Sequence, residues 1–134
     1  MKTFDTQSVQ IGIPAAEAFA FIADPANLPL WTNAFKSAGG GRAVLETPQG
    51  AVDIELETVT DGVAGTVDWH MTFPDGSLGQ AFSRVTPDGK DKSIYTFVLM
   101  APPVPLEALE GALEAQMAIL AEELTGLKSR LEAA

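Results

Sequence analysis

Apolar residues in the last third of the chain follow the spacing of one long helix. They recur every three or four positions, at Leu106, Leu109, Leu113, Met117, Leu120, Leu124, Leu127 and Leu131. This spacing is the stripe of an amphipathic helix. The positions beside the stripe are mostly Ala, Gly and Gln, whereas the flanks of a coiled-coil seam carry charges. The pattern therefore predicts a helix that packs on a sheet and not on a second copy of itself.

The middle of the chain changes to a period of two, which is typical of strands. Five strand candidates cover residues 43–47, 51–60, 66–73, 77–86 and 93–100. The segments between them are short and contain the Gly, Pro or Asp of tight turns, so we expect antiparallel neighbours. In the second and third candidates, apolar residues alternate with polar or charged ones. This alternation predicts an antiparallel sheet that packs on one side only.

The candidate strand at 77–86 leaves two registers open. Either Phe82 and Arg84 face inward, or Ala81, Ser83 and Val85 do. We favour the second register, because the small residues would leave room beneath the helix.

A first strand and two short helices precede this sheet. Residues 4–13 alternate as a strand, and residues 15–23 form an Ala-rich helix that stops before Pro25. Residues 27–31 form a second short helix that can extend to Phe35, and the glycines at 39–41 indicate a flexible break. Together these elements predict an α+β fold of about six strands and one long C-terminal helix.

Composition narrows the class of protein. The 134 residues are 46% hydrophobic and 19% charged, so we expect residues 1–134 to form a single globular domain. The absence of cysteine excludes disulfides, thiolate metal sites and a cysteine nucleophile. A formal net charge of −10 without a Lys/Arg cluster argues against nucleic-acid binding. No apolar run is long enough for a signal peptide or a membrane span, so we expect a cytoplasmic protein without membrane insertion.

The side chains that could carry acid–base chemistry fall on the polar face of the predicted strands. Alternation places His70, the single histidine, away from the apolar face, and does the same for Asp53, Glu55 and Glu57. No histidine and carboxylate have the spacing of metal ligands, and no Gly-x-Ser-x-Gly is present. We therefore expect no catalytic residue, no metal and no cofactor.

Two stretches resemble a known family. Ile13–Trp31 joins a strand end and a short helix to an Asp-Pro, Asn-Leu-Pro and Trp turn. It resembles the opening of the polyketide cyclase/dehydrase-like members of the START/Bet v 1-like (SRPBCC) superfamily. Arg84–Gly89 is similar to the penultimate hairpin of that family. The resemblance implies a helix-grip fold, in which a curved antiparallel sheet wraps around the long helix and encloses a ligand cavity.

The resemblance also implies several functions on one fold. The first is binding of a small hydrophobic or amphipathic ligand, such as a lipid or an aromatic or polyketide-like metabolite, by a monomer or weak homodimer. The second is a polyketide cyclase/dehydratase-like enzyme, for which Tyr95, Arg84 and His70 are the acid–base candidates. The third is an Hsp90-activator-like interaction module that uses an exposed face. Because the sequence offers no convincing acid–base set, we favour binding over catalysis.

The expected cavity wall combines apolar, aromatic and a few polar side chains, as small-molecule sites usually do. The candidates are Trp31, Phe35, Thr58, Trp69, Met71, Ser83, Tyr95, Phe97, Gln116, Met117 and Leu120. Met117 lies near the middle of the helical stripe, which makes it the first position to mutate.

Overall fold

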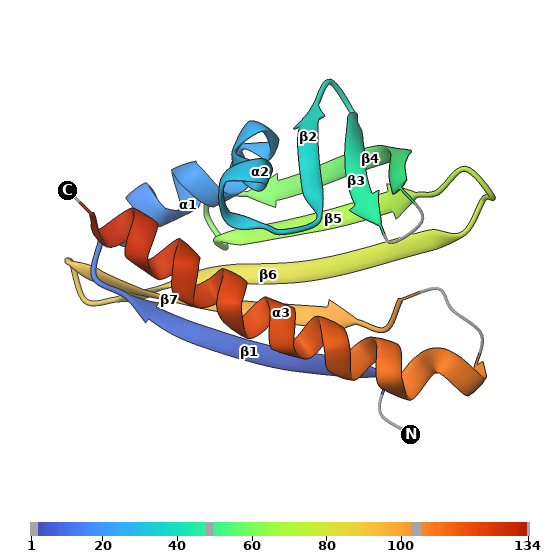
Figure 1. Ribbon diagram of the computed structural model, residues 1–134. Coiled ribbons are helices and arrows are strands. Elements are labelled where there is room, and N and C mark those ends of the chain that lie inside the picture. The colour runs from blue at the N-terminus through green and yellow to red at the C-terminus, as the bar shows by residue number, and fades with distance from the viewer. Residues whose placement is uncertain (1–2, 48–49, 103–105, 134) are drawn as a thin grey trace.

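The computed structural model of the protein describes residues 3–47, 50–102 and 106–133 (Figure 1). The side chains of residues 106–110 are not described. In chain order, the elements are β1 (Phe4–Ile11), α1 (Ala15–Ala23), the 3-10 turn η1 (Pro25–Asn27), α2 (Leu28–Trp31), β2 (Phe35–Gly39), β3 (Arg42–Thr47), β4 (Gly50–Asp61), β5 (Thr66–Thr72), β6 (Leu78–Asp88), β7 (Lys92–Met100) and α3 (Leu106–Glu132).

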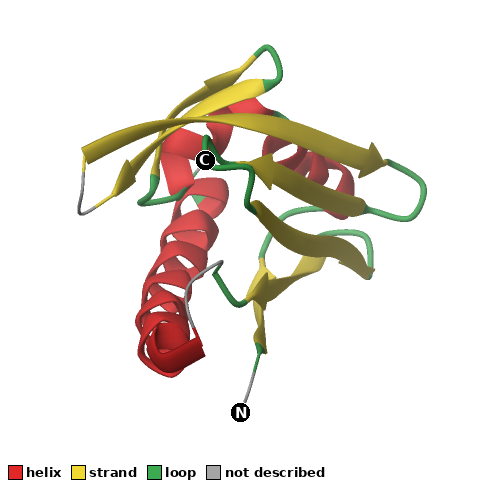
Figure 2. Ribbon diagram, turned by 90° about the vertical axis from the view of Figure 1, so that its right-hand side faces the viewer, coloured by secondary structure: helices red, strands yellow, loops and turns green. Residues whose placement is uncertain are grey.

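Within the described residues, the strands form one antiparallel sheet of seven strands in the order β1-β7-β6-β5-β4-β3-β2. The sheet curves over the helices, which lie on its concave side (Figure 2). The curvature is strong at β4, whose first half pairs with β3 and whose second half pairs with β5. Glu55 belongs to both pairings. This arrangement confirms the predicted α+β helix-grip fold.

The long helix α3 packs against β1 and α2 (Figure 1). Three leucines of its stripe, Leu120, Leu124 and Leu127, join the hydrophobic core and are at most 3% exposed. The side chains of Leu106 and Leu109, which the sequence also assigns to the stripe, lie outside the described residues. Among the described helices, none is both long and apolar enough to cross a membrane.

The structure corrects the prediction for residues 35–41. The sequence suggested the end of a helix followed by a flexible break, but Phe35–Gly39 is a strand that pairs with β3. The sheet therefore has one strand more than expected in the part of the chain that is described. The glycine run is the hairpin turn, because Gly40 and Gly41 have φ values of 63° and 77°. A left-handed pair of this kind suits a tight strand reversal.

The favoured register of β6 is confirmed. Ala81, Ser83 and Val85 are buried on the inner face. Arg84 is exposed on the other face, and its Nε donates a hydrogen bond to the carbonyl oxygen of Ala64 at 3.0 Å. No arginine of β6 is therefore available to an interior ligand.

Candidate functional site

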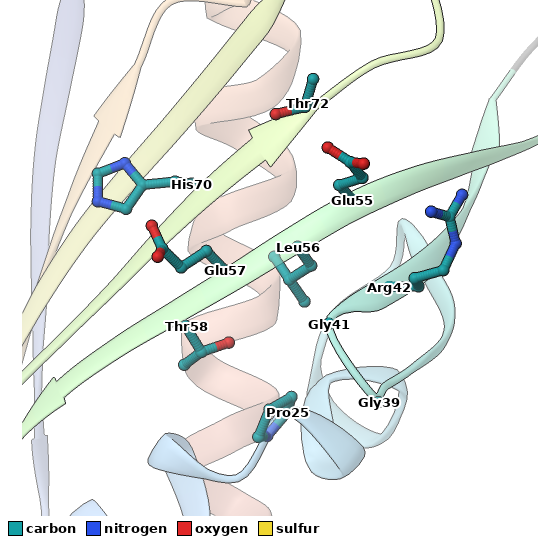
Figure 3. Close-up of a pocket in the computed structure, with 10 residues that line it drawn as sticks. All are labelled: Pro25, Gly39, Gly41, Arg42, Glu55, Leu56, Glu57, Thr58, His70 and Thr72. Carbon is teal, nitrogen blue, oxygen red and sulfur yellow. The ribbon is translucent and has the colours of Figure 1, made fainter.

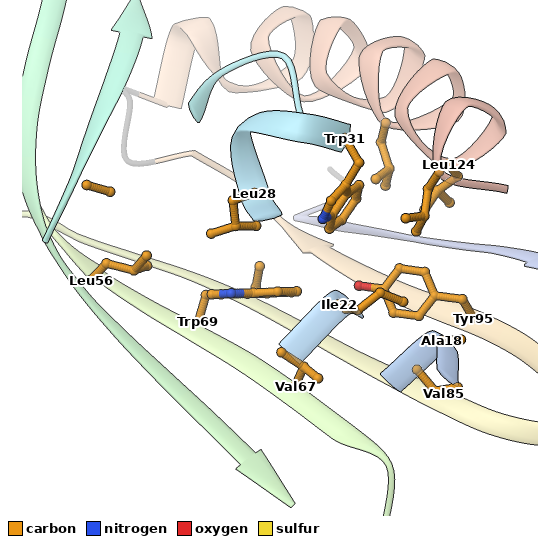
Figure 4. Packing of buried hydrophobic residues seen from close by; sticks show 14 of the residues in the cluster. Ala18, Ile22, Leu28, Trp31, Leu56, Val67, Trp69, Val85, Tyr95 and Leu124 are labelled. Atoms are coloured by element: carbon orange, nitrogen blue, oxygen red, sulfur yellow. The ribbon is translucent and has the colours of Figure 1, made fainter. Parts of the chain in front are cut away.

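Four aromatic side chains form a continuous chain of rings inside the fold. Figure 4 shows three of them, Trp31, Trp69 and Tyr95. Trp31 from α2 meets the edge of Tyr95 from β7, with ring centroids 6.1 Å apart. Tyr95 contacts Phe97 at 6.3 Å, and Phe97 stacks with Trp69 of β5 at 5.9 Å. Tyr95 and Phe97 are two residues apart on one strand, so alternation places both on the inner face. We call Trp31, Tyr95, Phe97 and Trp69 the aromatic chain.

Local hydrogen bonds place Trp31 in this interior. The Asp24 carboxylate accepts from the backbone N–H of Ala26 at 3.0 Å and caps η1. The side-chain amide of Asn27 donates to the carbonyl oxygen of Phe21 at 3.0 Å, which ties the turn back to α1. These two bonds hold the turn that precedes α2. The single helical turn α2 then directs Trp31 into the core, where it is 6% exposed.

The polar atoms of the aromatic chain are buried. Trp31 Nε1 and Trp69 Nε1 have no hydrogen-bond partner among the described residues, and Tyr95 Oη interacts with the Ser83 hydroxyl. Burial raises the pKa of the Tyr95 hydroxyl far above its usual range; the Ser83 hydroxyl partly offsets that rise and the charge of Glu123 adds to it. Tyr95 is therefore a neutral phenol at physiological pH, a hydrogen-bond donor and not a base.

Part of the inner face of the sheet lies outside the fully buried core, which we call the sealed core, and is only partly covered. Val67 and Tyr95 are fully buried, whereas Met71 and Phe97, which follow them on the same face of β5 and β7, are half-buried. On α3, Met117 is half-buried as well. Apolar side chains that point inward but keep solvent-accessible surface are typical of a binding surface for an apolar molecule.

An inward-facing polar pair on β1 was missed by sequence reasoning. Asp5 is 7% exposed, and its Oδ2 accepts a hydrogen bond from Gln7 Nε2 at 2.8 Å. The same Gln7 nitrogen donates to the backbone carbonyl oxygen of Met117 at 3.0 Å and so connects β1 to α3. The signal was present in the sequence, because Asp5 and Gln7 are in phase with the inward-facing Val9 and Ile11.

Most of the side chains that the sequence proposed for the cavity wall lie on the inner side of the fold. Ser83 is buried beside the aromatic chain and donates to the carbonyl oxygen of Val67 at 2.7 Å. Thr58 is half-buried and pairs across strands with Trp69. Phe35 packs on the core from β2, and Leu120 belongs to the core itself. Their role in binding remains a prediction.

The proposal for Gln116 needs correction. Gln116 is exposed on α3, whereas the sequence placed it at the edge of the buried face. The buried positions Leu113 and Leu120 are three and four residues away, so Gln116 borders the stripe at its solvent edge. The part of Gln116 in binding stays a prediction.

A carboxylate on α3 lies next to the site. Glu123 is half-buried and accepts a hydrogen bond from the backbone N–H of Asn33 at 2.7 Å. Burial raises the pKa of Glu123, and the bond from Asn33 opposes part of that rise. Glu123 lines a groove of about 880 Å³ between α2 and the last turns of α3, together with Trp31 and Arg130.

Glu123→Gln is expected to stabilise the protein at neutral pH. A carboxyl whose pKa is raised by folding favours the folded state below its ordinary pKa of 4.5, and that contribution is lost as the pH rises through the raised value. The amide keeps an oxygen to accept from Asn33 but carries no charge to bury. Urea unfolding should therefore give a higher midpoint for the variant at pH 7.5, and no such gain at pH 4.

Glu122→Gln, one residue away and exposed, controls for the loss of a surface charge. A Glu123→Gln midpoint below that of the unmodified protein at pH 7.5 would contradict the expectation.

A second groove, of about 660 Å³, lies where the sheet bends (Figure 3). It is lined by Pro25, Gly39, Gly41, Arg42, Glu55, Leu56, Glu57, Thr58, His70 and Thr72. It takes side chains from both faces of β4. The pairing of β3 with β4 ends at Glu55, and the N–H of Leu56 then donates to the carbonyl oxygen of Gly41 in the hairpin turn at 2.9 Å. His70 lies on the outer face as predicted, 3.4 Å from the Gln80 amide nitrogen and against the edge of Phe82. No group of three or more potential metal-binding side chains is present in the described part of the chain.

The curved sheet, the long helix and the apolar concave face define a domain of the START/Bet v 1-like (SRPBCC) class. Residues 5–132 match the polyketide cyclase / dehydrase and lipid transport family, and the chain belongs to that family. Curated proteins give no match to this sequence.

Solved structures with the same fold share little sequence with this chain. The di-domain ARO/CYC protein BexL is 16% identical, with a TM-score of 0.75 over 98% of this chain and 47% of its own. The ZhuI aromatase/cyclase from a Streptomyces species is 12% identical, with a TM-score of 0.67 over 96% and 93%. A START superfamily protein from Mycobacterium smegmatis is 14% identical, with a TM-score of 0.64 over 97% and 99%. At these identities the likeness shows the fold alone.

Proposed function

We propose that this protein binds a small apolar or amphipathic molecule in a cavity between the concave face of the sheet and α3. The observation that carries the proposal is the incomplete cover of inward-facing Met71, Phe97 and Met117 beside a sealed core. A structural core would bury such side chains fully, and each exposed apolar Å² costs about 25 cal/mol. A bound molecule would cover this surface and recover that free energy. The family description, which names polyketide and lipid chemistry, supports a ligand of this kind.

A second candidate is an aromatase/cyclase-like reaction, which the names of two structural neighbours suggest. One observation favours it: the buried carboxylate of Asp5 faces inward beside Phe97 and Leu99. A carboxylate in such a place can exchange protons with a bound ketone. We rank this candidate second because the hydroxyl of Tyr95 is a neutral donor and His70 lies outside.

The proposal also covers the domain organisation, the oligomeric state and the location of the protein. We propose that residues 1–134 act as one domain, as a monomer or a weak homodimer, in the cytoplasm. A chain without cysteine suits a reducing compartment.

Intrinsic fluorescence offers a direct test, because both tryptophans of the chain belong to the aromatic chain. The protein is titrated with fatty acids, neutral aromatic ketones and anilinonaphthalene sulfonate. We expect at least one probe to change the tryptophan emission saturably at one molecule per chain. The same probe should raise the melting temperature, since a ligand at a hundredfold excess over Kd stabilises by about 2.7 kcal/mol. A linear poly-β-ketone, incubated with the protein and recovered for mass spectrometry, separates the two candidates, because a cyclase would close it to a ring with loss of one water and a binding protein would return it unchanged.

Two neighbouring substitutions locate the binding surface. Met117→Glu places a charge on the half-covered inner surface, and we expect it to weaken binding at least tenfold. Gln116→Glu adds the same charge at the adjacent exposed position and should leave binding unchanged. Met71→Gln, on the opposite wall, serves as a second variant if Met117→Glu unfolds, and circular dichroism checks folding. Equal affinities for the Met117 and Gln116 variants would place the ligand elsewhere.

A further inference from the structure

The outer, convex face of the sheet carries apolar side chains where β6 and β7 pair. Near its end β7 is apolar on both faces. Phe97 and Leu99 pack on the core from the concave side, so alternation turns Val98 and Met100 outward. Phe82 of β6 lies directly opposite Val98 and faces outward with it. The three outward side chains are only half-buried, and they lie outside the hydrophobic core.

Two further apolar residues extend this surface. Phe4 of β1 lies opposite Met100 and is 47% exposed. Leu78, four residues before Phe82 on the same face of β6, is 68% exposed. We call Phe4, Leu78, Phe82, Val98 and Met100 the convex patch. The described helices lie on the concave side of the sheet, so none of them covers the patch (Figure 2).

The positions next to the convex patch are polar. On the same face, β1 presents Thr6 and Ser8, and β5 presents Asp68, His70 and Thr72. A sheet face that meets solvent normally alternates in this way and carries polar side chains. Apolar side chains gathered in one region of such a face are typical of a surface that a partner covers.

The groove of about 660 Å³ at the bend of the sheet adjoins the convex patch. His70 connects the two, because its ring lines the groove and also meets Phe82 edge-on, with ring centroids 6.0 Å apart. Glu57 is the cross-strand partner of His70, and Glu55 is the partner of Thr72. Both carboxylates line the groove and are exposed (Figure 3). The apolar patch therefore has an acidic rim on the side of β4.

The charge of this face restricts which partner would fit. β4 and β5 contain no Lys or Arg, and the chain as a whole carries a formal charge of −10. Arg84, the cation nearest to Phe82 along β6, is tied by its Nε to the carbonyl oxygen of Ala64. A nucleic acid, an anionic lipid surface or a second copy of this chain would bring like charge to the acidic rim, which is unfavourable. A basic partner would be attracted to it.

We propose that the convex patch and the adjoining groove dock a basic amphipathic helix of a partner protein. The apolar stripe of that helix covers Phe82, Val98 and Met100, as helices commonly cover the apolar face of a sheet. Lys or Arg side chains beside the stripe reach Glu55 and Glu57, because their long stems lie along apolar surface while the charge stays in water. This docking surface is on the opposite side of the sheet from the proposed ligand cavity and shares no residue with it.

Three synthetic peptides of equal length test this proposal. The first has leucines at helical spacing flanked by lysines, the second has glutamate in place of lysine, and the third has alanine in place of leucine. Fluorescence anisotropy measures the binding of each labelled peptide to the full chain at about 0.15 M salt. We expect the lysine–leucine peptide to bind about tenfold more tightly than either of the others, because it alone matches both the patch and its rim. Equal binding of either of the other two, or no binding of the first, overturns the proposal.

Substitutions on the convex face locate the docking surface. Val98→Thr keeps the branched shape of the side chain but adds a hydroxyl, and Glu57→Gln removes one charge at an exposed position. Each should weaken binding of the lysine–leucine peptide about three- to tenfold, and Glu57→Gln should also lower its salt dependence. Glu114→Gln removes an exposed charge on α3 and should leave the affinity unchanged. Met100→Gln replaces Val98→Thr if circular dichroism shows that the latter does not fold.

The outcomes separate docking from the binding of a small molecule. Val98→Thr and Glu57→Gln should leave the affinity for any small-molecule probe of the interior unchanged, since both lie on the outer face. Peptide binding that is insensitive to both substitutions would place the peptide elsewhere, and the proposal would be wrong. A loss for Glu114→Gln as large as that for Glu57→Gln would show attraction by net charge alone, which also overturns it. Self-association that Val98→Thr abolishes in sedimentation would identify a second copy as the occupant and would contradict the proposal.

Discussion

Gly65→Ala is expected to cost this protein about 3–5 kcal/mol of its free energy of unfolding. A Cβ atom at this position would lie 2.3 Å from the backbone carbonyl oxygen of Val85, a distance that real atoms do not reach. The carbonyl cannot move freely, because the N–H of Val85 donates to the Gly65 oxygen at 2.8 Å. Gly65 also has a φ of 77°, which a residue with a Cβ resists. The variant must therefore push β6 away from the turn between β4 and β5.

Gly89→Ala is the matched control for this prediction. Gly89 has nearly the same φ, 75°, but a Cβ atom added there would meet no atom within 4 Å beyond its chain neighbours. Only the backbone strain of about 1–2 kcal/mol remains there. Urea unfolding of both variants measures the difference, which is the cost of the close approach of Gly65 to β6. Equal losses for the two glycines would show that the turn can relax around the new methyl group.

Leu127→Ala is expected to lower the free energy of unfolding by about 2–5 kcal/mol. Leu127 is 0% exposed and belongs to the core that α3 shares with the sheet. Removing its side chain beyond Cβ loses apolar burial and leaves a cavity that packed neighbours fill only in part. For a domain whose total stability is about 5–15 kcal/mol, this loss is a large fraction.

The control lies on the same helix. Ile119 is 41% exposed, so Ile119→Ala should cost less than about 1 kcal/mol. Both variants end in Ala, and the helix propensities of Leu and Ile differ by only a few tenths of a kcal/mol, so the comparison reports mainly on burial. A loss for Ile119→Ala as large as that for Leu127→Ala would mean that the outer side of α3 is covered, which would favour an interface on that side.

The site balances stability against binding. The sealed part of the interior, around Val67 and Leu127, holds the sheet and α3 together. The adjoining part, at Met71, Phe97 and Met117, keeps apolar surface, which lowers stability in the free protein. Natural proteins tolerate such costs where a ligand recovers them.

Local patterns in the sequence were sufficient for several elements. The period of the leucine stripe predicted α3, and alternation in 51–60 and 66–73 predicted which faces of β4 and β5 are buried. Alternation also placed His70 outside. The strand β2 was missed because it is short and ends in glycines, whose turn conformation depends on pairing with β3. The inward position of Asp5 was missed because a carboxylate is unusual on a buried face.

By itself, the sequence determined the order and type of most elements, the apolar face of α3, β4 and β5, and the class of fold. These follow from periodicity, which depends on residues that are close along the chain. Only the tertiary structure decided which side chains meet inside. Trp31, Trp69 and Tyr95 come from a helical turn and two strands that are far apart in sequence, and the curvature at β4 and the tie between α1 and α2 bring them together. Whether their polar atoms find partners depends on packing in three dimensions, and no local pattern encodes that packing.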